Sequence, residues 1–213
     1  MKRALSTMVL AAATLVAALG TMTFPGRAEF DALKEAKGEE FDKRLFGKPI
    51  GQDKAYACFV RRYDAEHLAR YPLQKVGAMK LLVSVEYPPE DKTWRYSFRL
   101  GVKYRGRSVD YDSAGDCGHV IGEETGDEMR LGCGVDCDGG GLGVTLASDD
   151  KSATVELERI RIWQHRDDAM HESLVSGDDD KAFRLDRTGL RDCMSLVTDR
   201  KELAAIRRKG RMP

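Results

Sequence analysis

The sequence predicts an all-β fold: an antiparallel meander barrel or sandwich of about eight strands, with short N-terminal helical segments and a C-terminal helix. Two observations support this prediction. Apolar and polar residues alternate strictly over two long segments, residues 79–87 and 94–104. Shorter alternating segments then follow at close spacing up to residue 185, and helical patterns occur only towards the two ends. Barrel and sandwich both remain open, although the sequential order of the strands favours the barrel.

The first 28 residues have the three parts of a secretory signal peptide. Lys2 and Arg3 form a positive end, residues 8–19 form an apolar run, and the Gly-Arg-Ala of residues 26–28 offers small residues to a signal peptidase. The run is shorter than the ~20 residues that span a bilayer. We therefore expect cleavage near residue 28 and a periplasmic or secreted mature chain, with an uncleaved membrane anchor as the alternative.

The mature chain divides into an N-terminal arm, residues 29–50, and a single β domain with its C-terminal helix, residues 51–213. Apolar residues in the arm indicate either one face of a short helix or a loose segment. The whole chain has 35 basic and 35 acidic side chains, and loss of residues 1–28 leaves a formal charge of −3. A near-neutral chain argues against binding to nucleic acid. No later segment is apolar enough to cross a membrane.

The first half of the domain contains the clearest strands. Residues 56–63 predict a strand, and Asp64 then caps a short helix that Pro72 stops. The two long alternating segments follow. The polar turn at residues 88–92 joins them as a hairpin.

The second half continues with shorter strands. Val109 and Tyr111 mark a short strand, and residues 129–137 and 142–146 predict two more. In residues 153–163 the apolar positions change phase, which indicates a β-bulge near residues 158–159. Phe183 and Leu185 mark the last strand, and a helix begins at Ser195 or Thr198 and ends at Lys209 with a basic last turn.

The sequence has five cysteines, Cys58, Cys117, Cys133, Cys137 and Cys193. Because five is an odd number, at least one thiol has no partner inside the chain. Export makes disulfides the expected state of the others. If residues 129–137 form one strand, Cys133 and Cys137 lie about 13 Å apart at ~3.3 Å per residue. A disulfide spans ~7 Å at most, so these two should not bond unless the strand breaks at Gly134.

A hairpin offers Cys133 a better partner. With its tip at residues 125–126, Cys117 lies opposite Cys133 and His119 lies opposite Leu131. We therefore predict a Cys117–Cys133 disulfide. The second bond joins Cys193 to either Cys58 or Cys137.

The alternative use of these residues is a metal site. Cys117, His119, Cys133 and Cys137 supply three thiolates and one imidazole, which is a ligand set for zinc. Their spacings, C-x-H and C-x₃-C, are not those of the usual zinc knuckles. We expect no cofactor on the main interpretation and keep this cluster as the basis of a metal-binding or thiol-dependent alternative.

The segment GCGVDCDGGGLGV, residues 132–144, is the most unusual part of the sequence. It resembles a CxxxCDGGG-type motif of uncharacterised exported bacterial proteins. The resemblance covers only this short segment and implies no activity. Physically, three consecutive glycines at residues 139–141 allow a tight reversal between two strands or the close approach of another backbone.

No motif of a hydrolase, metalloprotease, nucleotide-binding or dinucleotide-binding protein occurs. His119 alone among the histidines falls on a predicted apolar face, where histidine is usually a hydrogen-bonded core residue. The sequence thus favours a binding or structural protein of the envelope over an enzyme.

Two ligand surfaces are conceivable. Aromatic residues including Trp94 could line the interior around a small apolar ligand, although filling the core is the simpler role. Arg95, Arg99 and Lys103 form a row on the outward face that could bind an anionic envelope component.

Overall fold

The computed structural model describes residues 27–122, 128–165 and 167–209. Nine strands form one antiparallel sheet, whose order is β6-β5-β4-β3-β2-β1-β9-β7-β8. The strands are β1 (Ala55–Arg62), β2 (Val76–Glu86), β3 (Arg95–Tyr104), β4 (Asp110–Gly122), β5 (Glu128–Gly134), β6 (Gly140–Leu146), β7 (Ser152–Gln164), β8 (Asp167–Val175) and β9 (Ala182–Thr188). The helices are α1 (Arg27–Phe46), α2 (Ala65–Arg70), the 3₁₀ helix η2 (Leu190–Leu196) and α3 (Arg200–Lys209).

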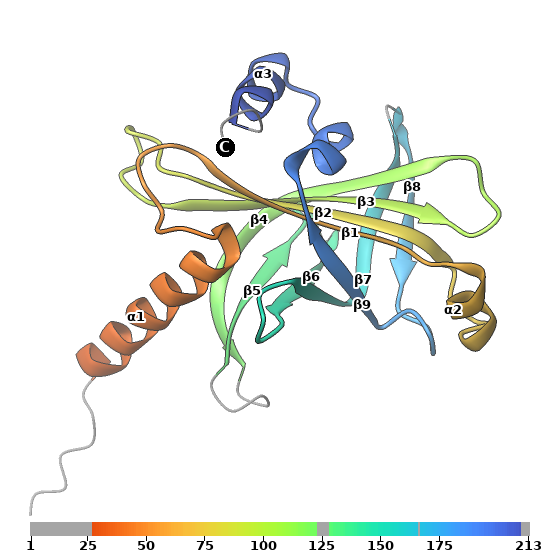
Figure 1. The fold of residues 1–213 in the computed structure, drawn as a ribbon, viewed down its shortest axis with the longest axis horizontal. Coiled ribbons are helices and arrows are strands. Elements are labelled where there is room, and N and C mark those ends of the chain that lie inside the picture. The colour runs from red at the N-terminus through yellow and green to blue at the C-terminus, as the bar shows by residue number, and fades with distance from the viewer. Residues whose placement is uncertain (1–26, 123–127, 166, 210–213) are drawn as a thin grey trace, which may run out of the picture.

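The sheet closes in a ring (Figure 1). Strand β1 pairs with β9, and β6 pairs with β7, so that the first and last parts of the meander meet. Strand β8 pairs with β7 outside the ring order. The predicted all-β class is therefore confirmed, with a single ring-closing sheet.

The predicted signal peptide falls mainly on residues 1–26, which lie outside the described residues. No helix in the described ranges has the length and apolar character needed to cross a bilayer.

The alternation in β2 and β3 sorts their side chains between two environments. Met79, Leu81, Val83 and Val85 are fully buried inside the ring, and the antiparallel register places Leu81 opposite Leu100. Phenylalanines and branched aliphatic residues from the other strands fill the same interior: Phe59, Phe98, Leu131, Val155, Ile160, Ile162 and Phe183. The interior is thus occupied by the protein's own core, but Trp94 does not belong to it, because its side chain is 39% exposed.

Strand β4 is longer than the sequence indicates. The short strand around Val109 and Tyr111 and the first arm of the Cys117 hairpin are one continuous strand of 13 residues. Its far half pairs with β5 in the predicted register, with Cys117 opposite Cys133 and Ile121 opposite Met129. The predicted hairpin tip, residues 125–126, lies outside the described residues.

The bulge predicted in β7 is present. The buried residues are at odd positions at the start of the strand, Ala153, Val155 and Leu157, and at even positions near its end, Ile160 and Ile162. The partner strand β6 shows the corresponding shift, with Leu142 opposite Leu157 but Gly140 opposite Ile160. An additional residue in β7 therefore bends the strand here, as a β-bulge does.

The glycine-rich segment packs backbone against backbone at this bulge. A side chain on Gly140 would place its Cβ 2.0 Å from the Arg159 carbonyl oxygen, and one on Gly141 would lie 2.2 Å from that of Cys133. The strand of residues 129–137 expected from the sequence is shorter than predicted, because β5 ends at Gly134. Cys137 instead lies exposed in the turn with a left-handed φ of 55°.

The predicted arm contains a helix of 20 residues, α1, whose last turns pack on the ring. Phe41 and Leu45 belong to the core, whereas Leu33 is exposed. Arg187 of β9 holds the end of this helix: its guanidinium donates to the carbonyl oxygens of Leu45 at 2.7 Å and Arg44 at 3.0 Å. Such bonds satisfy the carbonyl groups that a helix end leaves open. The sequence pattern of residues 29–50 is weak because most of α1 faces away from the sheet.

The C-terminal segment covers the outer side of the ring. Cys58 and Leu82 point outward from β1 and β2, where they form a second apolar cluster with Cys193, Leu196 and Ile206. Gly101 allows Leu196 to lie flat on β3, since a Cβ there would approach it to 2.7 Å. The predicted C-terminal helix is present as α3, which begins at Arg200 and ends at Lys209, and η2 before it is an element that the sequence did not predict.

The structure contains two disulfides, Cys58–Cys193 and Cys117–Cys133. The second is the bond that the hairpin register predicts. The first is one of the two pairings that the sequence leaves open for Cys193, and it fastens η2 to β1. Cys137 is a free, exposed thiol.

Peptide mapping without reduction should recover Cys58–Cys193 and Cys117–Cys133, with Cys137 alone modified by a thiol reagent in the native protein. Cys117→Ser with Cys133→Ser should lower the free energy of unfolding by about 3 kcal/mol, because the bond closes a loop of roughly 15 residues. Cys137→Ser is the matched control and should leave the denaturation midpoint unchanged. A peptide that joins Cys137 to Cys193 would contradict the observed pairing.

Candidate functional site

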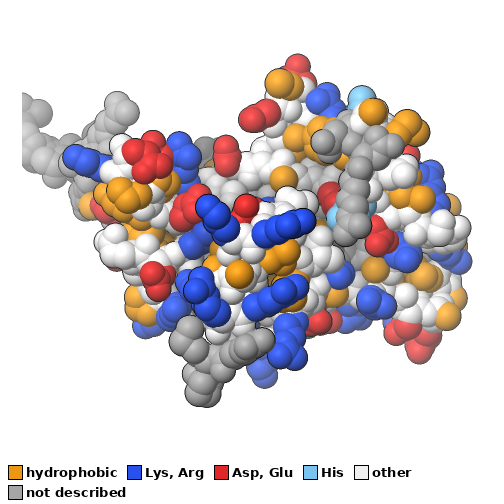
Figure 2. Space-filling view, turned by 90° about the horizontal axis from the view of Figure 1, so that it is seen from above, with side chains coloured by type: hydrophobic (Ala, Val, Ile, Leu, Met, Phe, Trp, Pro, Cys, Tyr) orange, Lys and Arg blue, Asp and Glu red, His pale blue; other side chains and the backbone are white. Residues whose placement is uncertain are grey.

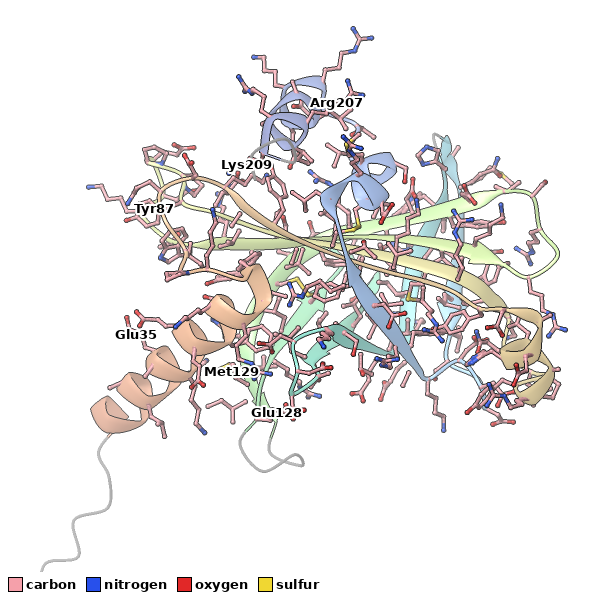
Figure 3. The ribbon with its side chains drawn as sticks, in the orientation of Figure 1. Glu35, Tyr87, Glu128, Met129, Arg207 and Lys209 are labelled. Carbon is pink, nitrogen blue, oxygen red and sulfur yellow. A yellow bond between two sulfur atoms is a disulfide. The ribbon has the colours of Figure 1, made fainter. Side chains whose placement is uncertain are left out.

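A cleft of about 750 Å³ lies between α1 and the strands β3 and β4. Its lining combines acidic, aromatic and apolar side chains: Glu35, Glu39, Glu40, Asp42, Lys43, Pro49, Ile50, Trp94, Tyr96 and His119. Figure 3 shows Glu35 of α1 and Tyr87, which directly follows β2, on the same side of the molecule. The cleft has the size and mixed lining that are typical of small-ligand sites.

The carboxylate of Asp42 organises the floor of the cleft. It accepts a hydrogen bond from the Tyr96 hydroxyl at 2.5 Å through Oδ2, and its Oδ1 is paired with His119 Nε2 at 2.9 Å. Only 7% of the Asp42 side chain is exposed. Because Asp42 is on α1, Tyr96 on β3 and His119 on β4, this carboxylate connects the helix to both strands.

Tyr96 keeps its proton in this arrangement. Burial raises its pKa, and the hydrogen bond to Asp42 and the charge of that carboxylate raise it further, well above the ordinary value of about 10. The hydroxyl group therefore remains a donor to Asp42 at any physiological pH. The polar floor of the cleft is consequently preorganised before a ligand arrives.

Gly38 brings the helix close enough for these bonds to form. A Cβ at this position would lie 3.1 Å from His119 Nδ1. Glycine inside a helix costs about 1 kcal/mol relative to alanine. Its presence here is explained by the close approach of α1 to the imidazole ring.

Aromatic rings form one wall of the cleft. Trp94 is 39% exposed and packs edge-to-face on Tyr87, with ring centroids 5.0 Å apart. Tyr96 and His119 form a second edge-to-face pair at 4.8 Å. The exposed ring of Trp94 is free to contact a ligand, whereas His119 is held from two sides.

Carboxylates dominate the opposite rim. Glu35, Glu39 and Glu40 have no ion-pair partner among the residues that the structure describes, and Lys43 is the single basic residue in the lining. Since Asp42 adds a fourth carboxylate, the cleft has an excess of negative charge. A cation is the ligand that this field attracts.

The alternative metal cluster is not assembled. Cys117 and Cys133 are bonded to each other and therefore have no thiolate to offer, while Cys137 lies in the turn after β5. His119 is paired with Asp42. Across the described ranges, no group of three or more His, Cys, Asp or Glu side chains could hold a metal ion.

The predicted basic row is divided between separate partners. Arg95 pairs with Asp91 at 2.7 Å, and Lys103 lies 3.7 Å from Asp110. Arg99 was expected to face water, but it lies beneath α3 and pairs with Glu202 at 2.8 Å. Trp94, the other speculative ligand residue, lines the acidic cleft instead of the basic row.

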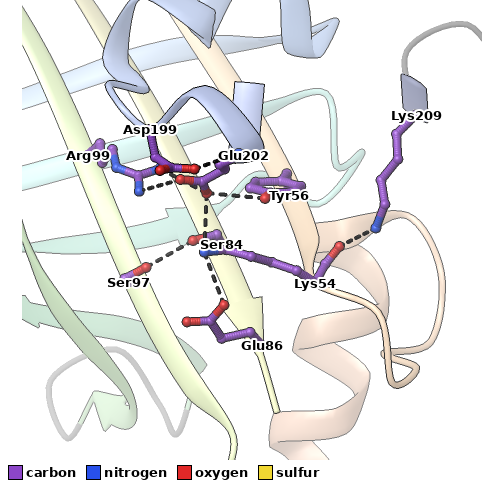
Figure 4. A network of polar contacts seen from close by, with 9 residues as sticks. All are labelled: Lys54, Tyr56, Ser84, Glu86, Ser97, Arg99, Asp199, Glu202 and Lys209. Carbon is purple, nitrogen blue, oxygen red and sulfur yellow. Dashed lines mark hydrogen bonds and ion pairs between the residues drawn. The ribbon is translucent and has the colours of Figure 1, made fainter. Parts of the chain in front are cut away.

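Arg99 belongs to a polar network under α3 (Figure 4). Glu202 also pairs with Lys54 at 3.1 Å and accepts a hydrogen bond from the Tyr56 hydroxyl at 3.1 Å. Burial by itself raises the pKa of Glu202, but the hydrogen bonds and charges of Arg99 and Lys54 outweigh it and lower the pKa below its ordinary value. Glu86 at the end of β2 pairs with Lys54 as well, at 3.1 Å. Three segments of the chain, α3, β3 and the start of β1, thus meet at one carboxylate.

Asp42 is the functional candidate that the sequence pattern misses. It lies between the core residues Phe41 and Leu45 in a segment with weak patterning, and the sequence contains no signal that a buried partner exists for it. His119 was identified by its place on an apolar face. Its partner comes from 77 residues earlier in the chain, so that only the fold brings the two together.

Acidification should loosen α3. Because the pKa of Glu202 is lower in the folded protein than in the unfolded chain, its contribution to stability is complete above the ordinary value of about 4.5 and is lost as the pH falls through the folded pKa. The melting temperature of the wild type should therefore fall further between pH 6 and pH 3 than that of Glu202→Gln.

The control for this comparison is Glu66→Gln, since Glu66 is a largely exposed acid on α2. Its pH profile should follow the wild type. Parallel profiles for the wild type and Glu202→Gln would show that Glu202 does not stabilise the docked helix.

Comparison of the chain with models of known protein families, with curated proteins and with solved structures finds no match. A ligand is therefore inferred from the chemistry of the cleft itself.

Proposed function

We propose that the protein is an exported binding protein of the bacterial envelope, and that the cleft between α1 and the strands β3 and β4 takes a small ligand with an apolar or aromatic body and a positive charge. This proposal rests on one observation. The cleft contains both an exposed tryptophan and carboxylates that have no ion-pair partner among the described residues. Cation–π contact and charge attraction then act on the same ligand.

The rigidity of the cleft supports binding. Asp42 fixes Tyr96 and His119 before the ligand arrives, so that little ordering accompanies association. The exposed Trp94 supplies a large contact area with few rotatable bonds. A volume of about 750 Å³ suits a molecule of metabolite size.

Export is supported by the signal-like N-terminus and by the two disulfides. Disulfides persist in the periplasm or outside the cell, where the environment is oxidising, and are rare in the cytosol. The Cys58–Cys193 bond joins residues that are 135 positions apart, so it depends on the completed fold.

Expression in a bacterium with a periplasm should place the protein in the periplasmic fraction, with an N-terminus near Glu29. Intact-mass measurement of that fraction checks this expectation, because the mature mass lacks the apolar run of residues 8–19. A variant with Leu15→Arg and Val16→Arg interrupts the run and should stay unprocessed in the cytosol. Exported protein that retains residues 8–19 would contradict cleavage.

Benzyltrimethylammonium is the probe for the cleft, with benzyl alcohol and benzoate as neutral and anionic analogues. Calorimetric titration should give the tightest binding for the cation. Trp94→Leu should weaken it by about 1 kcal/mol, roughly fivefold, through loss of the cation–π contact. Glu35→Gln with Glu39→Gln should weaken the cation specifically and leave benzyl alcohol unaffected.

The matched control is Trp163→Phe, which alters the other tryptophan, on β7, and should leave the affinity unchanged. Equal affinity for benzoate and the cation would contradict the role of the carboxylates. Binding that survives Trp94→Leu without loss would place the ligand elsewhere.

A further inference from the structure

The helix α3 has two chemically different faces. Leu203 and Ile206 pack into the outer apolar cluster around Cys58–Cys193. Arg200, Lys201, Arg207 and Arg208 are all exposed. Residues seven positions apart in an α-helix are separated by almost two full turns. Arg207 and Arg208 therefore lie on the same face as Arg200 and Lys201, about 10 Å further along the helix axis.

The outer face carries positive charge without compensation. Within the described part of the chain, none of these four side chains has an ion-pair partner. Glu202 is the single acid of the helix, and it points inward to Arg99 and Lys54. The inward turn of this carboxylate leaves the outward face purely basic.

The four cations stand on an outlying surface of the molecule. Figure 1 shows α3 raised above the outer side of β1–β3 as the outermost element there. Figure 2 looks down on this side and shows Lys and Arg side chains gathered over its middle. In Figure 3, Arg207 extends away from the rest of the protein, whereas Lys209 turns back towards the sheet. Lys209 Nζ donates to the Lys54 carbonyl oxygen.

We propose that this face, formed by Arg200, Lys201, Arg207 and Arg208, docks the protein on the surface of an anionic phospholipid bilayer. A broad negative surface can contact all four side chains of a protruding helix at once. A charged polymer strand would be favoured by a groove with cations along both sides, and the four residues all project from one side of one helix.

The docking is electrostatic and does not involve insertion. Amphipathic helices that enter a bilayer need a free apolar face. The apolar face of α3 is already packed against η2 and the sheet, where Cys58–Cys193 holds the neighbouring segment. Attraction between basic residues and anionic headgroups is worth about fivefold in partitioning for each Lys or Arg, so four residues contribute on the order of several hundredfold.

This surface is independent of the acidic cleft, which is formed by α1, β3 and β4. A bilayer-docked protein would keep that cleft available to a soluble ligand. The mature chain is slightly acidic as a whole, so that the local basic face, and not net charge, would orient it on the membrane.

Co-sedimentation with vesicles tests the proposal, using the protein recovered from the exported fraction. Phosphatidylcholine vesicles with phosphatidylglycerol should bind the wild type in about 0.01 M salt, and vesicles of phosphatidylcholine alone should not. Binding should disappear near 1 M salt, where the screening length falls from ~30 Å to ~3 Å. Replacing Arg200, Lys201, Arg207 and Arg208 by Gln should reduce partitioning several hundredfold without changing the thermal melt.

The matched control replaces four other exposed lysines, Lys48, Lys92, Lys151 and Lys181, by Gln and makes the same change in net charge. It should bind as the wild type does. All three proteins share one N-terminus, so any contribution from that end cancels. Arg207→Glu with Arg208→Glu alters only two residues of the same face but changes the net charge by the same amount, and it should likewise reduce binding to the anionic vesicles.

Three results would overturn the proposal. The first is an equal loss in the control, which would make net charge the cause. The second is binding that persists at high salt or on neutral vesicles, which would indicate insertion. The third is binding to soluble dextran sulfate with none to the anionic vesicles, which would identify a polyanion as the partner. A failure of the cleft to bind organic cations would leave these measurements unaffected.

Discussion

The carboxylate of Asp42 is the point at which the helix, the ring and the candidate site depend on one another. It is nearly fully buried, and its two oxygens engage Tyr96 and His119 on adjacent strands. A buried charge is tolerated only when hydrogen bonds replace its lost hydration, so these contacts fix the position of α1 as well as the floor of the cleft. Arg187 secures the other end of the same interface by capping the last carbonyl groups of the helix.

Charge is distributed unevenly in a chain whose overall balance is close to neutral. The cleft side collects carboxylates from α1, and the opposite side presents the basic face of α3. Glu202 is decisive for the second arrangement, because it pairs with Arg99 and Lys54 beneath the helix and does not pair with the outer cations. Each proposed interaction therefore uses the charge that remains after internal pairing, which the composition of the chain does not reveal.

Period-two patterns were informative wherever one side of a strand meets the core. They located β2 and β3, the bulge in β7 and the register that places Cys117 opposite Cys133. They failed for β8, which pairs on only one side and is not part of the ring, and for the separate strand expected at Val109 and Tyr111. They also extended β5 to Cys137, because an alternating pattern does not show that Gly134 ends the ladder and that a turn with left-handed residues follows.

The sequence by itself determined the all-β class, the hairpin register and the disulfide that follows from it, because alternation and cysteine spacing act between neighbouring segments. Tertiary structure alone decided that the sheet closes in a ring, that Cys193 bonds Cys58, and that Asp42 meets His119. It also separated Arg99 from the row of Arg95 and Lys103. Each of these contacts is between residues that lie tens to more than a hundred positions apart in the sequence. Such contacts depend on how the helices pack on the finished sheet, and no local sequence pattern encodes that packing.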